Sequence, residues 1–115
     1  MPFDRGDLDY FDSMIEAAER IFRHIGPMSE AEFINRMIVF DAVCLNLIRI
    51  GEAARFLSEA AKAALPETHW PDVVTLRNRI AHGYASLDAR IIWLTATKDV
   101  PELATRISAL MERPD

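Results

Sequence analysis

The side chains best suited to chemistry are concentrated in residues 77–84, Arg-Asn-Arg-Ile-Ala-His-Gly-Tyr. Histidine exchanges protons near neutral pH, and arginine binds a phosphate through two hydrogen bonds and stabilises negative charge that develops on it. Because RNA carries its own nucleophile, the 2′-hydroxyl, one histidine and one arginine could suffice for strand cleavage. The segment therefore predicts phosphodiester chemistry without a metal. A basic helix end with a histidine is, however, more often an ordinary surface feature or a helix-dipole partner.

Helical geometry separates the groups that this chemistry would need. At about 100° per residue, Val73, Leu76 and Ile80 fall on one side, which we expect to dock onto the rest of the protein. The polar side chains of the segment spread across the side facing away. Arg77 and His82 diverge by about 140° and lie roughly 7.5 Å apart along the axis. A two-fold dimer would bring the histidine of one chain near the arginine of the other.

The elements that must position this segment are predicted to be helices. Alanine, leucine, isoleucine and glutamate dominate the 115 residues, with only four glycines, which favours helix over sheet. We expect an all-α protein, an antiparallel up-and-down bundle of four main helices with a long second helix, forming a single domain over residues 1–115. Apolar periodicity and capping signals predict helices over 7–25, about 30–58, 71–83 and from 87 onward, with a short helix over 58–65.

The predicted second helix carries charges on its apolar stripe. The apolar positions are Ile34, Ile38, Leu45 and Ile48, and the charged ones are Asp41, Glu52 and Arg55. Because burying an unpaired charge is costly, each of the three predicts a partner. Two interpretations of Glu52 stay open and are compatible: an internal ion pair with Arg55 or Arg77, or a role in orienting Arg77. Gly51 indicates a close helix crossing beside it.

Pro101 should interrupt the last helix. Proline has no backbone N–H, so a regular helix would lose the bond from residue 101 to residue 97. We expect a break or kink near residues 98–100, with a final apolar stripe after it.

Charge and cysteine content exclude several classes of protein. The net charge of −5 argues against a broad nucleic-acid surface, so any RNA contact must rest on a local basic patch. Cys44 is the only cysteine, which excludes an intrachain disulfide and a cysteine-based zinc site, and we expect it to be buried. No apolar run approaches the roughly 20 residues of a membrane helix, and the first residues do not form a signal peptide. We expect a cytoplasmic protein that uses no membrane and no cofactor.

The sequence closely resembles the HepT-like family, part of the HEPN group of helical domains. The family signature, arginine, four residues, histidine, one residue and tyrosine, stands as Arg77, His82 and Tyr84. The family's Ile-Gly-Glu-Ala segment stands at residues 50–53, and Asp-Val-Pro-Glu-Leu at residues 99–103 also looks like the family. The resemblance covers nearly the whole chain.

This resemblance implies a toxin of a type VII toxin–antitoxin pair. Such a protein would be a metal-independent ribonuclease acting as a homodimer, with its arginine and histidine at the dimer cleft. Its partner would be a small nucleotidyltransferase antitoxin, MntA, that silences it by transferring AMP to the motif tyrosine. Carried over by position, Arg77 binds phosphate, His82 is the acid/base and Tyr84 is the adenylylated residue, with Asn78 assisting and Glu52 supporting.

Two other functions fit the same residues. The chain could be a non-catalytic binding or regulatory subunit of a nucleotidyltransferase complex, presenting substrate or a regulatory tyrosine. It could also be a purely structural dimeric bundle. RNA cleavage by the purified dimer, without a partner, separates the first of these from a ribonuclease.

Overall fold

The computed structural model describes residues 4–112, and within that range every regular element is helical, which confirms the predicted all-α class. The molecule measures 45 × 29 × 20 Å along its principal axes. The longer helices are α1 (Arg5–Ile25), α3 (Met37–Arg55), α5 (Trp70–Gly83) and α7 (Val100–Met111), and the shorter ones are α2 (Glu30–Ile34), α4 (Glu59–Ala63) and α6 (Ala89–Leu94). No helix of residues 4–112 is long and apolar enough to cross a membrane.

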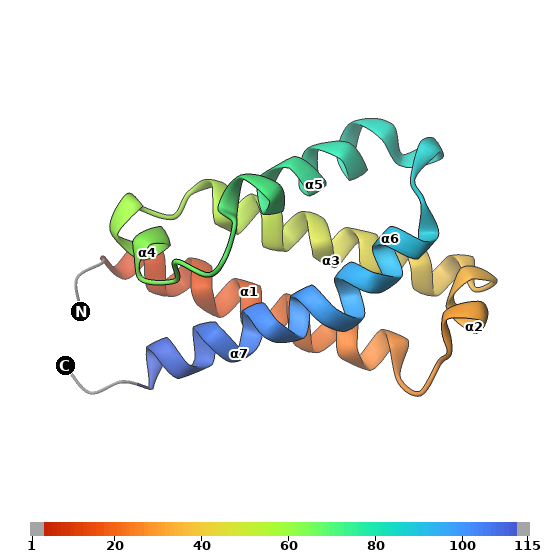
Figure 1. Ribbon diagram of the computed structural model, residues 1–115, viewed down its shortest axis with the longest axis horizontal. Coiled ribbons are helices and arrows are strands. Elements are labelled where there is room, and N and C mark those ends of the chain that lie inside the picture. The colour runs from red at the N-terminus through yellow and green to blue at the C-terminus, as the bar shows by residue number, and fades with distance from the viewer. Residues whose placement is uncertain (1–3, 113–115) are drawn as a thin grey trace.

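Helix α3 occupies the centre of the arrangement. It packs against α1 on one side and α5 on the other, and α7 returns along α1 (Figure 1). Successive long segments run in opposite directions along the long axis in this view, and α6 continues into α7. The motif helix α5 therefore rests on α3, and α3 supplies most of the surface that positions it.

The long second helix predicted over residues 30–58 is wrong, because the chain bends at Asn35 and Arg36 between α2 and α3. The amide of Asn35 donates to the carbonyl of Ala31 (2.9 Å), competing with the backbone as asparagine commonly does. The bend lets the fully buried Phe33 pack its ring 5.8 Å from Phe40 and 5.4 Å from Trp93. Aromatic packing at the end of the bundle thus overrides helix continuity.

The apolar stripe predicted to be the core of this helix is largely exposed. Ile38 is 85% exposed, Leu45 60% and Ile34 48%, while Ile48 is half-buried. The buried side of α3 is formed instead by Val43, Cys44, Leu47, Ile50 and Ala54. Helix α3 is apolar around a wide arc, and periodicity alone does not say which part of such an arc meets α1 and α5.

Pro101 does not break the last helix. A π-helical turn over Thr95–Asp99 joins α6 to α7, and the N–H of Val100 donates to the carbonyl of Thr95. The predicted position of the irregularity, near residues 98–100, was correct. The irregularity is a π-helical turn, which keeps the helix continuous, and not a break. Pro101 is the second residue of α7 and follows directly on this turn.

A buried carboxylate ties the start of α1 to the turn between α3 and α4. Asp7 accepts hydrogen bonds from the backbone N–H (2.8 Å) and the hydroxyl (2.6 Å) of Ser58, and from the N–H of Asp4 (3.2 Å). Burial raises the pKa of Asp7, but the hydrogen bonds from Ser58 and Asp4 outweigh it and bring that pKa below its ordinary 3.8. Asp7 is therefore an ionised side chain that holds the start of α1 to the turn between α3 and α4.

Cys44 is buried, as predicted. Burial, followed by the nearby charge of Asp41, raises the pKa of its thiol to about 12. The thiol is therefore protonated at neutral pH and packs as a small apolar group.

Candidate active site at the crossing of α3 and α5

The start of α5 is fixed by a buried tryptophan. The helix begins at Trp70, one residue before the predicted start, with Pro71 in its first turn. The indole N–H of Trp70 donates to the carbonyl of Lys62 (3.1 Å), which ties α5 to the end of α4. Gly83 ends the helix as predicted, and a 3₁₀ turn over Tyr84–Ser86 follows.

Gly51 sets how closely the two helices approach. A Cβ atom at this position would lie 2.2 Å from the Cβ of Arg77 and 3.2 Å from the carbonyl oxygen of Val73. No side chain fits there, so the predicted close crossing is confirmed. The first residue of the motif consequently sits directly on the backbone of α3.

Glu52 holds the guanidinium of Arg77. Its Oε2 lies 2.9 Å from Nε of Arg77, and its Oε1 lies 3.3 Å from Nη1 of Arg55. The contact with Nε is an ion pair rather than a well-directed hydrogen bond. Nη1 of Arg77 donates to Oδ1 of Asn78 (3.0 Å), and the Arg77 side chain is only 21% exposed. Glu52 therefore pairs with both predicted partners, and the pairing limits where the Arg77 guanidinium can point.

Tyr84 packs on the same face of α3. Its hydroxyl donates a hydrogen bond to Oδ1 of Asp41, and its ring centroid lies 6.0 Å from that of Phe40. The side chain remains 46% exposed, so the phenol edge is accessible. The sequence marked Asp41 as a charge that needs a partner but did not indicate which one. The signal lay in its position three turns before Glu52 on one face of the helix.

His82 lies on a different face of α5. It is exposed, and within residues 4–112 it has no hydrogen bond or ion pair. It lines a shallow concavity of about 460 Å³ that Arg77 does not reach, whose polar walls are Thr75, Asn78, Arg79, His82 and Ser86. Sequence reasoning missed Arg79 and Ser86, although the spacing of three between Arg79 and His82 already placed these two on one face.

The structure thus divides the predicted site residues into two groups. Arg77, Tyr84 and Glu52 gather at the contact between α5 and α3, whereas His82 faces solvent, with Asn78 between the groups. The expectation that all polar groups face away from the bundle is wrong for Arg77 and Tyr84. These two flank the apolar arc of α5, and the close crossing at Gly51 draws them onto α3.

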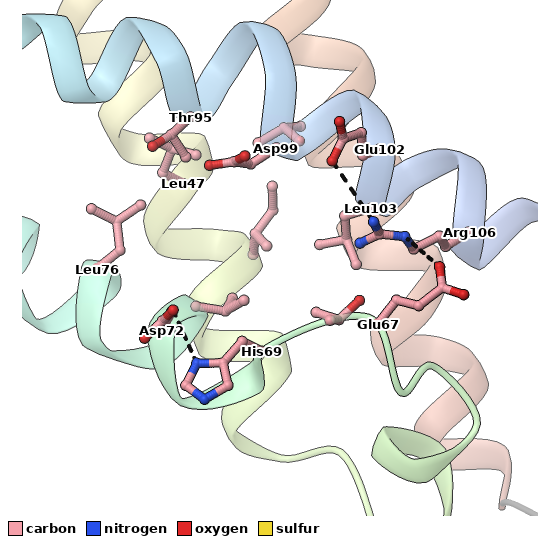
Figure 2. Close-up of a pocket in the computed structure, with 14 residues that line it drawn as sticks. Leu47, Glu67, His69, Asp72, Leu76, Thr95, Asp99, Glu102, Leu103 and Arg106 are labelled. Atoms are coloured by element: carbon pink, nitrogen blue, oxygen red, sulfur yellow. Dashed lines mark ion pairs between the residues drawn. The ribbon is translucent and has the colours of Figure 1, made fainter.

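A second cavity, of about 420 Å³, lies at the opposite end of α5 from the motif (Figure 2). Most of its charged rim is internally paired: Nδ1 of His69 lies 2.9 Å from Oδ2 of Asp72, and Nε of Arg106 lies 3.4 Å from Oε2 of Glu67. It contains none of the predicted site residues. No group of three histidine, cysteine, aspartate or glutamate side chains in residues 4–112 is placed to hold a metal ion.

Comparison with known proteins assigns this helical domain to a class. The family described as "Ribonuclease HepT-like" matches residues 14–110. The "Probable ribonuclease HepT" of Thermococcus cleftensis is 28% identical over 106 residues, covering 92% of this chain and 96% of that protein. The "Putative RNase MJ1380" of Methanocaldococcus jannaschii is 29% identical over 94 residues, covering 82% of this chain and 86% of that protein. No solved structure gives a significant match.

A helical domain that presents an arginine and a histidine from one helix, and a tyrosine from the turn after it, thus falls in a class of RNA-cleaving enzymes. The chain belongs to the HepT-like ribonuclease family, as the sequence predicted. Its all-helical architecture is compatible with a HEPN-like fold.

Proposed function

We propose that this protein is a cytoplasmic ribonuclease toxin that cleaves RNA without a metal at a site formed across a homodimer. The observation that carries the proposal is the separation of Arg77 and His82 on one helix, with Arg77 held against α3 and His82 turned to solvent. Because the two side chains lie on different faces of α5, we do not expect a single chain to present both of them to one phosphate. Two copies related by a two-fold axis would bring each histidine to the arginine of the facing chain.

An exposed apolar surface supports the homodimer. Ile38, Leu45 and Met37, all on α3, are 85%, 60% and 75% exposed, and Ile38 and Leu45 share a face with Asp41, the partner of Tyr84. Several large apolar side chains exposed on one helix commonly mark an interface, because leaving them in water is unfavourable. Because Asp41 on the same face holds Tyr84, we propose that the interface lies beside the motif.

The proposed chemistry uses only the chain and its substrate. The 2′-oxygen of RNA forms a bond to phosphorus as the bond to the 5′-oxygen breaks, which leaves a 2′,3′-cyclic phosphate and a 5′-hydroxyl. His82 transfers the proton that this exchange requires, because it is accessible and not held by another side chain of residues 4–112. Arg77 stabilises the negative charge that develops on the phosphate, with Glu52 and Asn78 holding its guanidinium.

Silencing by a nucleotidyltransferase antitoxin of the MntA type fits the position of Tyr84. Its hydroxyl lies at the surface, hydrogen-bonded to Asp41, where a second protein can transfer AMP to it. Tyr84, in the 3₁₀ turn that follows α5, and Arg77 both contact α3. A phosphate and nucleoside on Tyr84 would add bulk and negative charge near Arg77, and RNA would be excluded by competition and repulsion.

The decisive experiment measures cleavage of RNA by the purified chain and by a His82→Ala variant, with circular dichroism as the check on folding. We expect the wild type to cleave without a partner and in the presence of EDTA, and the variant to lose cleavage while keeping its helical spectrum. Cleavage that persists in His82→Ala would refute the assignment of the acid/base. Adenylylated Tyr84 on a chain that never cleaves RNA would favour the regulatory-subunit alternative.

A further inference from the structure

The concavity beside His82 has its own cation, Arg79. Its polar walls come mainly from one stripe of α5, since Thr75, Asn78, Arg79 and His82 follow the i, i+3, i+4, i+7 spacing that places side chains on one face of a helix. No acidic residue of the described chain lines this concavity. Arg79 therefore gives this concavity a positive charge on a chain whose net charge is −5.

Arg79 differs from Arg77 in its availability. Arg77 is mostly buried and ion-paired with Glu52, whereas Arg79 is exposed and makes no hydrogen bond or ion pair with any residue of 4–112. All the donors of its guanidinium therefore remain available to a ligand. A free guanidinium binds a phosphate through two parallel hydrogen bonds at little cost in lost partners.

Neighbouring groups extend the same surface. The amide nitrogen of Asn78 makes no hydrogen bond within the described residues, because only its Oδ1 is used by Arg77. The hydroxyl of Ser86 donates to the carbonyl of Gly83 (2.9 Å), which leaves the hydroxyl oxygen able to accept a hydrogen bond. Donors and an acceptor thus surround His82 in a concavity of about 460 Å³, a volume in the range of small-ligand pockets.

We propose that Arg79 binds a backbone phosphate of the RNA in the concavity of its own chain, next to His82. This inference rests on the proposed ribonuclease function and adds a residue to it: Arg79 would be a substrate-binding residue that places the ribose beside the histidine. Arg77 would then serve the phosphate under attack from the facing chain. One active site would in this way hold two guanidinium groups with different tasks.

The test compares Arg79→Ala, Arg79→Lys and His82→Ala with Arg23→Ala, which removes the same charge from an exposed position of α1 that does not line the concavity. Cleavage of a fluorescent RNA gives kcat and KM. Binding of the same RNA with 2′-O-methyl groups, which lacks the nucleophile, gives Kd at several salt concentrations.

We expect Arg79→Ala to raise KM and Kd roughly tenfold and to lower the salt dependence of binding by about one phosphate contact, with a much smaller change in kcat. Arg79→Lys should recover part of the affinity, because lysine keeps the charge but not the two-pronged geometry. His82→Ala should bind normally and not cleave, and Arg23→Ala should behave as wild type.

The outcomes separate the two proposals. A wild type that binds the RNA through Arg79 but never cleaves would end the ribonuclease proposal and keep the phosphate site. An active enzyme whose KM, Kd and salt dependence are unchanged by Arg79→Ala would overturn the role of Arg79 alone. A wild type that does not bind the methylated RNA would also overturn it.

Discussion

Replacing Gly51 by alanine tests the contact on which the site is built. The new Cβ would lie 2.2 Å from the Cβ of Arg77 and 2.9 Å from its Cγ. Ordinary carbon contacts are about 3.5–4.0 Å, so α5 must move away from α3 by more than about 1 Å. Overpacking of this kind costs about 1–3 kcal/mol, and the better helix propensity of alanine returns at most about 1 kcal/mol.

We therefore expect Gly51→Ala to lower the free energy of unfolding by about 1–2 kcal/mol, which corresponds to a Tm lower by roughly 4–10 °C. Displacement of α5 also stretches the 2.9 Å contact between Glu52 and Arg77, so RNA cleavage should fall more steeply than stability. Thermal unfolding followed by circular dichroism gives the first quantity, and cleavage kinetics well below Tm give the second.

Two controls accompany this variant. Gly6→Ala adds a Cβ 3.2 Å from Oδ1 of Asp4, the capping oxygen of α1, which must shift by a few tenths of an ångström; the better helix propensity of alanine offsets this, and we expect stability to change little. Adding Arg77→Gly to Gly51→Ala removes the Cβ of residue 77 with which the new Cβ clashes. The loss of stability in the double variant should therefore be smaller than the sum of the losses in the two single variants. A Gly51→Ala protein with unchanged Tm and full activity would refute the close crossing.

Four further experiments have expected outcomes. Asp7→Asn should cost about 2 kcal/mol at neutral pH, because Ser58 loses a charged acceptor. Since the folded pKa of Asp7 lies below 3.8, its stabilisation is complete above that pH and is lost as the pH falls through the folded pKa, so urea unfolding of the variant should vary less with pH in this range. Cys44, with its pKa raised to about 12, should resist thiol reagents at pH 8 until the protein is unfolded. Ile38→Asp should yield a folded monomer by size-exclusion chromatography with light scattering, and Tyr84→Phe should abolish the AMP mass increase on co-expression with the antitoxin.

A result that contradicts one of these expectations would show which part of the reasoning is wrong. An Asp7→Asn variant as stable as wild type would mean that the carboxylate is dispensable at the joint with Ser58. Rapid labelling of native Cys44 would show that α3 opens locally. A dimeric Ile38→Asp protein would move the proposed interface away from α3, and AMP on the Tyr84→Phe protein would place the modification on another residue.

Much of the motif helix could be predicted from the sequence because its signals are local. Pro71 and Gly83 set its ends to within a residue, and Gly51 marked the close crossing correctly. The charges on the predicted stripe of α3 also carried information. Asp41 and Glu52 do have partners, and those partners are the two motif side chains Tyr84 and Arg77.

The predictions that were wrong concern which side of a helix is covered. The stripe through Ile38 and Leu45 has the period of a core, yet it is exposed, because α3 receives α1 and α5 on its other sides. Asn35 ends α2 because the ring of Phe33 gains more from packing than the helix gains from continuing. Local propensity predicts neither the exposed stripe of α3 nor the end of α2, because both depend on contacts with residues distant in the chain.

The amino-acid sequence by itself determined the all-α class, the ends of α5 to within a residue, the family and the spacing of Arg77, His82 and Tyr84, because capping, periodicity and motif are short-range properties. Only the tertiary structure decided that Arg77 and Tyr84 lie against α3 while His82 faces solvent beside Arg79. The physical reason is steric. The absence of one side chain at Gly51 lets α5 settle onto α3, and the angle of each residue around α5 then fixes whether it is held or free.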